Sequence, residues 1–492
     1  MVTECIANDL KFQPLASREV VAQFNGGTIT SDAGGLLLRE VEELTGILAR
    51  FAECFDDFRN PEYIDFTVKE LLKQRVFALC LGYEDLNDHD SLRKDPLLAT
   101  LVGRADPTGQ DRLLPRDRGC PLAGKSTLNR LELTPSGANA KSRYKKIAAR
   151  QYKIDKFFID TFIQLQQLNS EPPEEIILDF DATDARLHGH QLGRFFHGYY
   201  GDYCYLPLYV FCGDHLLCAK LRPSSIDAAA GSLKVLQKIV AQIRAKWPNV
   251  KILVRGDSGF CRENMMAWCE TNTVGYLFGL PKNKRLLQTI GKEMVEAKTM
   301  FEQTGEASRV FGETTYRTLD SWSCARRVVG KAEHLAKGAN PRFVVTSLKK
   351  EDVNAKTLYE DKYCGRGDME NCIKEQKLFH FADRLSCQTM RANQVRLSLS
   401  AVSYVLMNAV REHGLKNTPL ANAQSNTIRE KVMKIGAQVT VSVRRVVFAL
   451  SESFPLREVF WQALANIQTA FAPIVALIEP ATAREIPTVA LE

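Results

Sequence analysis

Apolar residues recur at helical spacing through the first third of the chain. In residues 66–84, apolar side chains return every three to four positions, which places them on one face of a helix. Similar patterns predict helices at residues 27–50, with Asp32 as N-cap after a Gly-rich turn, and at residues 126–133 and 142–168. Residues 103–124 are rich in Gly, Pro, Arg and Asp and are typical of a loop. Residues 1–168 are therefore predicted to form a mainly helical region.

The pattern changes at Pro172-Pro173, after which short apolar runs rich in β-branched residues predominate. Five runs predict strands: IILDFDATD, LPLYVFCGD, LLCAKLRP, KILVRGDSGF and VGYLFGLP. Helical spacing returns between them at residues 232–247 and 263–272. Strands and helices in this order predict an α/β fold with a mixed sheet.

Beyond this sheet, the pattern predicts a β-rich segment followed by helices. Residues 283–348 alternate as strands do and are interpreted as an insertion. Residues 357–377 and 389–411 have helical spacing, although glycines interrupt the first of these helices. Residues 412–492 are predicted to be helical, with a basic patch. Its members are Arg429, Lys431, Lys434, Arg444 and Arg445.

The composition is that of a globular protein with a mild basic excess. The 492 residues are 45% hydrophobic and 25% charged, with a formal net charge of +7. This excess fits a nucleic-acid partner without requiring one. The most apolar late stretch, residues 459–478, contains Gln, Asn and Pro, and is interpreted as packed helix, not as a membrane span.

Cysteine usage and the N-terminus bear on the cellular compartment. The 13 cysteines are scattered and include no CxxC pair, so neither a zinc ribbon nor a thioredoxin-like site is indicated. Free thiols in this number fit a reducing compartment. The first residues lack the basic and apolar segments of a signal peptide. We therefore expect a cytoplasmic protein.

Acidic residues stand at the ends of two predicted strands. Asp179, Asp181 and Asp184 end the first strand, and Asp257 ends the fourth. Because side chains alternate along a strand, Asp179 and Asp181 share a face. Several carboxylates close together at strand ends repel one another and destabilise the folded protein unless cations neutralise them. Two divalent cations held by such carboxylates support phosphodiester cleavage; the alternative is that Asp184 and Asp257 are cap or turn residues.

A third carboxylate lies within a stripe on the interrupted helix. Residues three, four, seven and eleven positions apart fall near one helix face. The stripe consists of Tyr363, Arg366, Glu370, Lys374 and Lys377. Glu370 has the chemistry of a metal ligand, and the flanking Arg and Lys side chains have that of phosphate ligands. An exposed face with ordinary Glu–Lys pairs is the alternative.

These residues together resemble the insertion-sequence DDE transposases. Tyr363, Arg366, Glu370 and Lys377 match the family's Y-R-E-K signature without a departure. Asp181-Ala182-Thr183 and Arg255-Gly256-Asp257-Ser258 are similar to the family's motifs around its first and second acids. The segments FHGYYGDYCYLPLYVF, LCLGYEDLNDHDSLRKDP and MRANQVRL extend the resemblance, to the insertion-sequence family thirteen-eighty, over most of the chain.

The resemblance implies a ribonuclease-H-like catalytic fold with a β-rich insertion between the second and third acids. It carries Asp181, Asp257 and Glu370 over as ligands of two Mg²⁺ ions, for which Mn²⁺ substitutes, with Asp179 as an alternative to Asp181. It carries Tyr363, Arg366 and Lys377 over as DNA-binding residues at the transposon end. Lys374 is expected to bind DNA as well, from its position on the same stripe. The resemblance further implies that Trp322 holds a flipped base, and that a homodimer acts on double-stranded DNA in a bacterial, nucleoid-associated setting.

The implied organisation divides the chain into five parts. These are a helical DNA-binding region at 1–168, the first part of the catalytic core at 169–283, the insertion at 284–350, the second part of the core at 351–411 and a helical region at 412–492. Sequence-specific binding of the terminal inverted repeats is expected in the first part. Arg130, with Ser126 and Asn129, would begin a recognition helix because these side chains reach base edges. A capped surface helix is the alternative.

Other patterns point to different classes of protein. Residues 119–126 fit the GxxxxGK[ST] phosphate loop of NTPases, but the polar run before them does not resemble the buried strand that such a loop needs. Histidines and a cysteine at positions 188, 190, 197 and 204 could form a zinc site, although their spacing fits no standard ligand pattern. A non-transposing nuclease of the same fold, or an inactive descendant, also remains open.

Overall fold

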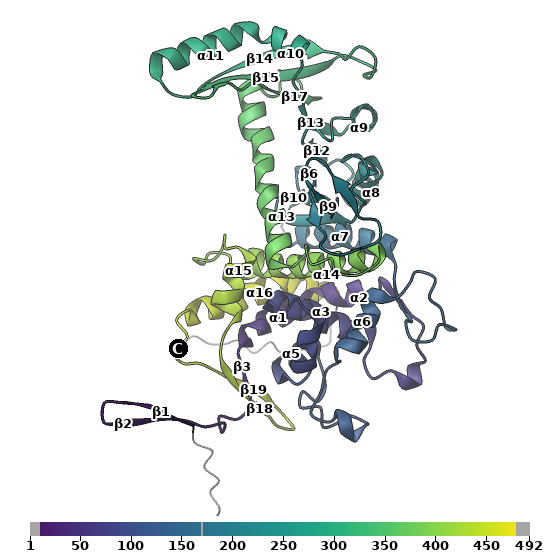
Figure 1. Cartoon of the computed structure of the whole chain (residues 1–492), viewed down its shortest axis with the longest axis vertical. Helices are drawn as coiled ribbons and strands as arrows, with labels where there is room; N and C mark the ends of the chain where they lie inside the picture. The colour runs from purple at the N-terminus through teal and green to yellow at the C-terminus, as the bar shows by residue number, and fades with distance from the viewer. Residues whose placement is uncertain (1–9, 169–170, 479–492) are drawn as a thin grey trace, which may run out of the picture.

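A computed structural model describes residues 10–168 and 171–478, and a long sheet runs through its upper half (Figure 1). Within these residues the sheet has nine strands. Their order is β11 (His215–Lys220), β10 (Leu208–Cys212), β6 (Glu175–Ala182), β12 (Lys251–Gly256), β13 (Gly275–Leu280), β17 (Arg342–Thr346), β15 (Arg326–Leu335) and β14 (Ser308–Tyr316), with β16 (Gly338–Ala339) beside β15. The neighbours β6, β12 and β13 are parallel, and the other pairs are antiparallel.

Alternation along the strands gives the sheet two different faces. Leu178 and Phe180 point to one face, where they pack with helices α8 (Ser232–Lys246) and α9 (Glu263–Thr271). Ile177, Asp179 and Asp181 point to the opposite face, as the period of two predicts. That face is covered by a long helical segment. It comprises α12 (Ala355–Thr357), a π-helical turn (Leu358–Tyr363), a 3₁₀ turn (Cys364–Arg366) and α13 (Gly367–Phe379).

The predicted insertion is continuous with the rest of the sheet. Strand β17 pairs directly with β13, so β14, β15 and β17 extend the sheet away from the helical base. Helices α10 (Lys284–Thr289) and α11 (Gly291–Thr304) precede these strands and cover them, at the top of Figure 1. The sequence interpretation missed both helices. In α11 only Ala297 is fully buried, so the apolar periodicity that would reveal the helix is weak.

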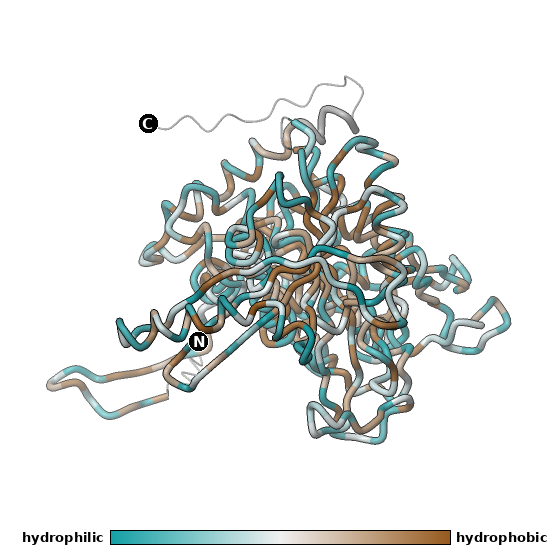
Figure 2. The backbone as a smooth tube through the Cα atoms, turned by 90° about the horizontal axis from the view of Figure 1, so that it is seen from above, coloured by the Kyte–Doolittle hydropathy of each residue, from teal (hydrophilic) through white to brown (hydrophobic). Residues whose placement is uncertain are grey.

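The two ends of the chain share one helical base. Helix α14 (Met390–Ala409) lies beneath the sheet and packs against α1 (Leu36–Thr45) and α3 (Val68–Leu81). The other helices of the base are α2 (Ile47–Ala52), α4 (His89–Leu92), α5 (Pro96–Val102), α6 (Lys125–Leu133), α7 (Gln151–Gln166), α15 (Ser425–Ile428) and α16 (Arg457–Ile478). Arg429 donates from Nε to the carbonyl of Cys80 at 2.8 Å, which ties the late segment to the early one. Seen from above, many apolar positions lie in the middle of the body (Figure 2).

Three details of the helical regions differ from the sequence interpretation. Residues 142–150 do not begin a helix, because β5 (Ile147–Ala149) pairs with β4 (Phe55–Asp57) before α7 starts at Gln151. Asp32 precedes a 3₁₀ turn (Ala33–Gly35), but its side chain makes no capping hydrogen bond; it is buried and pairs with Lys434 at 2.5 Å. Residues 412–492 include a hairpin, β18 (Ala437–Val441) and β19 (Val446–Leu450), beside β3 (Ile29–Thr30).

Two further features lie outside the nine-stranded sheet and the helical base. A hairpin of β1 (Leu10–Leu15) and β2 (Arg18–Ala22) projects from the base and is exposed along its length (Figure 1). Strands β7 (Ala185–Arg186), β9 (Asp202–Tyr205) and β8 (Phe195–His197) form a small sheet inserted between β6 and β10. Among the described helices, none has the length and apolar character needed to cross a membrane.

Candidate active site

Asp179 is buried in a two-pronged ion pair at the centre of the sheet. Strands β6 and β12 run in parallel with Asp179 opposite Arg255. The guanidinium donates from Nε and Nη2 to the two carboxylate oxygens, each at 2.6 Å. Its Nη1 donates to the carbonyl of Lys362 at 2.5 Å, which holds the irregular helical segment against the sheet. Both oxygens of Asp179 are therefore engaged in positioning the surrounding elements.

Asp181 lies two residues further along the same face and has fewer partners. Its side chain is 18% exposed, and its Oδ1 accepts a hydrogen bond from the Ala182 amide at 3.0 Å. Burial raises the pKa of the Asp181 carboxyl to about 6; the charges of Asp257 and Glu370 also raise it, while that of Arg366 lowers it. A carboxyl with this pKa lacks enough cationic partners to offset its desolvation.

Asp257 follows β12 directly and belongs to the same edge as Asp181. Gly256 pairs with Phe180, so the next residue of each strand lies at the carboxyl end of the parallel pair. The Gly259 amide donates to Asp257 Oδ1 at 2.8 Å, so Asp257 also shapes the turn that follows the strand. Asp257 is therefore both a turn residue and a candidate metal ligand, the two roles that its sequence position suggested.

Gly279 on β13 has no side chain, so Tyr363 and the turn after Asp257 can pack closely against this strand. A Cβ atom there would lie 2.6 Å from the hydroxyl of Tyr363 and 2.9 Å from the Ser258 amide. Contacts this short exclude any side chain at Gly279 without movement of its neighbours. The sequence interpretation missed this glycine because the contacts come from three separate segments of the chain.

The helical segment brings Arg366 and Glu370 to the carboxylates. Arg366 Nη1 is 4.0 Å from Asp181 Oδ1, and its Nη2 is 3.6 Å from Glu370 Oε1. The guanidinium therefore lies between two of the predicted metal ligands. The Glu370 side chain is 66% exposed, turned toward Arg366 and solvent. In residues 10–168 and 171–478, no three His, Cys, Asp or Glu side chains lie close enough to hold a metal ion.

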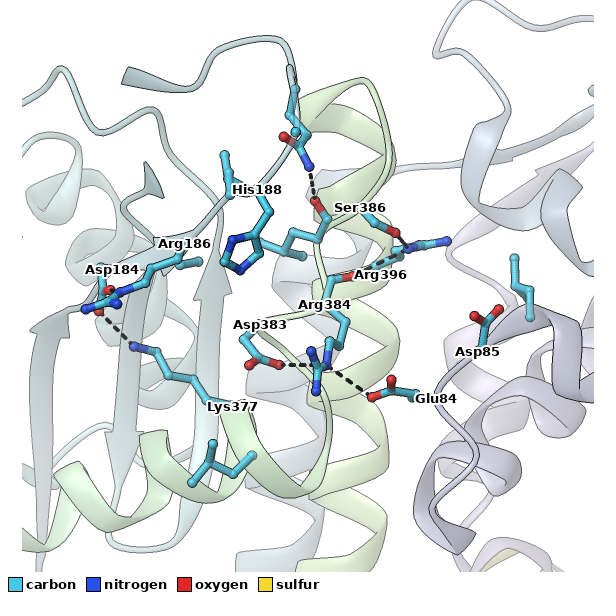
Figure 3. A pocket seen from close by; sticks show the side chains of 17 residues that line it. Glu84, Asp85, Asp184, Arg186, His188, Lys377, Asp383, Arg384, Ser386 and Arg396 are labelled. Carbon is cyan, nitrogen blue, oxygen red and sulfur yellow. Dashed lines mark hydrogen bonds and ion pairs between the residues drawn. The ribbon is translucent and has the colours of Figure 1, made fainter. Parts of the chain in front are cut away.

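Lys377, about two turns beyond Glu370, pairs with a different acid. Its Nζ donates to Thr183 Oγ1 at 2.7 Å and to Asp184 Oδ1 at 3.1 Å (Figure 3). Burial alone would raise the pKa of Asp184, but Lys377 and then Arg186 hold it below its ordinary value. Lys374 is exposed on the same helix. The predicted stripe therefore faces the strand ends, with two of its cations engaged by carboxylates.

Comparisons with known proteins bear directly on this arrangement of acids. The family profile "Transposase DDE domain group 1" matches residues 12–472. The chain belongs to this family of DDE transposases. These transposases are nucleases and transesterases, and they generally use divalent metal ions. A comparison with curated proteins finds no match. Among solved structures, the transposase is similar to "Cryo-EM structure of piggyBac transposase synaptic complex with hairpin DNA", with 12% identity, a TM-score of 0.37, and coverage of 92% of this chain and 83% of the other.

Trp322 of the transposase does not present its ring to solvent. The side chain is 4% exposed and packs edge-on against Tyr316, with ring centres 5.7 Å apart. The Arg326 guanidinium lies 5.4 Å from its ring centre and is itself paired with Glu263 and Glu270. The expectation that Trp322 stacks on a flipped base is not supported by this conformation, because packing already covers the indole.

Arg130 lies far along the sequence from the acids and in a different body of the transposase. It is half-buried in the last turn of α6, a helix that packs against α3 and α14. Lys125, which opens this helix, pairs with Asp90 at 3.0 Å. No strand leads into residues 119–126 in the described chain, so the motif there lacks the architecture of an NTP-binding loop.

The histidine cluster also lacks the geometry of a metal centre. His188 and His190 are exposed, whereas Cys204 is buried. The His197 ring packs on Tyr200, with ring centres 4.8 Å apart. As for the carboxylates, no metal-binding group is formed among the described residues of this segment.

Proposed function

We propose that this transposase cuts and rejoins DNA at the ends of an insertion sequence, with Asp181, Asp257 and Glu370 as its catalytic carboxylates. The observation that carries the proposal is the division of labour on β6. Arg255 binds both carboxylate oxygens of Asp179, whereas Asp181 accepts a hydrogen bond only from a backbone amide and has Arg366 at 4.0 Å, although burial raises the pKa of both acids. A buried, incompletely paired acid at the carboxyl end of a strand is typical of a functional site.

The strand topology supports a ribonuclease-H-like core for the proposed enzyme. Three antiparallel strands, β6, β10 and β11, precede α8, and two parallel strands, β12 and β13, follow on the other side of β6. This arrangement places the ends of β6 and β12 together at the centre of the sheet. The Y-R-E-K stripe then lies across that edge, which supports membership of the insertion-sequence family thirteen-eighty.

The donor set suits Mg²⁺, with Mn²⁺ as a substitute, because hard cations prefer carboxylate oxygens. Asp181, Asp257 and Glu370 would hold the two ions. Bound there, divalent cations activate an attacking oxygen and stabilise a leaving one. Burial raises the pKa of Asp181 and Arg366 offsets that rise only in part, so a further cation at this carboxyl would stabilise its charged form. Glu370 must turn from Arg366 toward the strand ends to complete the set.

The other residues of the stripe bind and orient DNA in this proposal. Arg366, Lys374 and Lys377 would contact phosphate oxygens near the scissile bond, and Tyr363 would hold the strand beside Asp257. Water attacks the phosphodiester at the element's end and releases a 3′-hydroxyl. That hydroxyl then attacks a phosphodiester of target DNA, so one bond forms as one breaks.

Recognition of the terminal inverted repeats falls to the helical region at 1–168 in this proposal. Arg130 on α6 is the candidate for a base contact. The partners are the transposon ends and the target, both double-stranded DNA. Two copies of the chain would act together as a homodimer on paired ends.

The decisive experiment is cleavage of a labelled duplex that carries the element's own terminal repeat, with Mg²⁺ or Mn²⁺. Wild-type protein should cut at the repeat boundary, and Glu370→Ala should not. Asp368→Ala is the matched control, since Asp368 is an exposed acid on the same helix. Cutting without preference for the repeat would identify a general nuclease instead. Binding without cutting would identify an inactive descendant.

A further inference from the structure

Aromatic side chains lie exposed on the small sheet that follows the first catalytic acid. Phe196, Tyr199 and Tyr203 are 59%, 87% and 45% exposed. Phe196 on β8 is directly opposite Tyr203 on β9, and their ring centres are 5.6 Å apart. Large aromatic residues clustered on a surface contribute little to the stability of the chain that carries them. Such a cluster marks an interaction surface.

The aromatic cluster is attached to the catalytic edge by short connections. Strand β7 begins four residues after Asp181, and the Leu187 amide donates to the Tyr203 carbonyl at 2.9 Å. The hydroxyl of Tyr200 donates to the Ala182 carbonyl at 3.4 Å. The small sheet therefore begins at the strand end that carries Asp181. DNA at the carboxylates would pass close to it.

Two arginines accompany the aromatic residues in this segment. Residues 185–204 contain Arg186, Arg194 and three histidines against a single acid, Asp202. The Arg194 guanidinium lies 4.5 Å from the ring centre of Tyr203. This combination of cations and flat rings is complementary to a nucleic-acid strand, since phosphates pair with the cations and bases stack on the rings.

A cavity continues from this segment toward the helical base. It has a volume of about 650 Å³ and lies between residues 184–191, α13 and the loops around Glu84 and Asp383. Figure 3 shows Arg186 and Lys377 together at Asp184, with Glu84 and Asp85 on the far side of the cavity. Its lining mixes charges: Arg186, Lys377, Arg384 and Arg396 stand among the acids Glu84, Asp85, Asp184 and Asp383, and Arg186 is the cation nearest in sequence to the aromatic cluster.

We propose that Phe196, Tyr199 and Tyr203 form a stacking platform for unpaired bases of the DNA strand at the cleavage site. The proposal rests on the function proposed above and adds the substrate form to it. Aromatic faces accept any base, so the platform favours frayed or distorted DNA over intact duplex, independently of sequence. Arg186 and Arg194 would hold the phosphates of the same strand. This surface takes the place that sequence reasoning gave to Trp322, whose ring is covered.

The test compares DNA binding to two probes of random sequence at low salt. One is a blunt duplex, and the other is the same duplex with a tail of unpaired thymidines. Tyr199→Leu and Phe196→Leu remove a ring but keep an apolar side chain. Trp461→Leu is the matched control, because Trp461 is 57% exposed on α16, away from the small sheet. Thermal midpoints show that each variant is folded, and sedimentation reports self-association.

Wild-type protein should bind the tailed duplex more tightly than the blunt duplex. Each platform variant should bind the tailed duplex about tenfold more weakly than wild type does, with an unchanged affinity for the blunt duplex. Trp461→Leu should behave as wild type. Equal binding of both probes by wild type, or an unchanged preference in both platform variants, would overturn the platform alone. A change in self-association without a change in preference would identify the surface as a contact between copies. Failure of wild type to bind either probe would count against the proposed function itself.

Discussion

Replacing Asp181 by asparagine should make the folded protein more stable at neutral and alkaline pH. The carboxyl is largely buried, and its pKa is raised to about 6 chiefly by that burial. An acid whose pKa is raised on folding binds its proton more tightly in the folded state. The protonated Asp181 carboxyl adds fully to the free energy of unfolding below about pH 4. This contribution is lost as the pH rises through about 6 and is absent at higher pH. Asparagine keeps the shape without the charge.

The magnitude follows from the same pKa. A rise from 3.8 to about 6 corresponds to about 3 kcal/mol at about 1.4 kcal/mol per tenfold change in proton affinity. This is an upper value, since the 18% exposure of the side chain admits some solvent screening. Arg366 loses one anion at 4.0 Å in the variant but retains Glu370. A net gain of about 1–3 kcal/mol is therefore expected at pH 8, and none at pH 4.

The assay is thermal unfolding of wild type and Asp181→Asn across this pH range, with and without Mg²⁺. The midpoint of the variant should exceed that of wild type at pH 8, and the difference should vanish toward pH 4. Mg²⁺ should raise the midpoint of wild type at pH 8 but leave the variant unchanged, because the ion stabilises the state that binds it. This readout does not depend on cleavage.

Asp184→Asn is the matched control because its pKa is shifted in the opposite direction. Although burial raises it, Lys377 and Arg186 hold the pKa of Asp184 below its ordinary value. Loss of that charge should lower the midpoint at neutral pH, and the loss should disappear in acid. If both variants shift the midpoint in the same direction at pH 8, the assignment of one acid to catalysis and the other to pairing is wrong.

Three other changes test separate parts of the structure. Asp179→Ala leaves Arg255 buried without its anion and should cost about 3–5 kcal/mol in the free energy of unfolding; a loss under about 1 kcal/mol would contradict its structural role. Gly279→Ala places a Cβ 2.6 Å from the Tyr363 hydroxyl, so repeat-specific cleavage should fall while the fold, followed by circular dichroism, persists; full activity would show that Tyr363 moves freely. Titration calorimetry should detect no ATP binding by wild type or Lys125→Ala, and binding that is lost in the variant would restore the NTPase alternative.

The sequence predicted the strands of the core because each is a short, strongly apolar run bounded by turn residues. It also placed Asp179 and Asp181 on one face, since the period of a strand is fixed. It could not assign Arg255 to Asp179, because that contact depends on the register of two strands 76 positions apart. Periodicity identifies a face, but pairing across strands decides which acid on that face is already neutralised.

The same limit explains the misses elsewhere in the chain. Helix α11 presents a polar surface, and its amphipathic pattern is too weak to separate it from the strands that follow. The β18–β19 hairpin is largely exposed on one strand, so its apolar residues do not form a buried run. Trp322 carries no sequence signal for burial, because its partners Tyr316 and Arg326 pack around it only in the folded sheet.

The cations of the Y-R-E-K stripe have two competing sets of anions. In this structure Arg366 lies near Asp181 and Glu370, and Lys377 pairs with Asp184, so carboxylates occupy the groups assigned to phosphate. A phosphate that displaces them leaves the acids uncompensated, unless divalent cations arrive at the same edge. Binding of DNA and binding of metal are then mutually favourable, since each removes the electrostatic cost of the other. If Glu370 completes the carboxylate set as proposed, Arg366 would have to release it when metal and DNA bind.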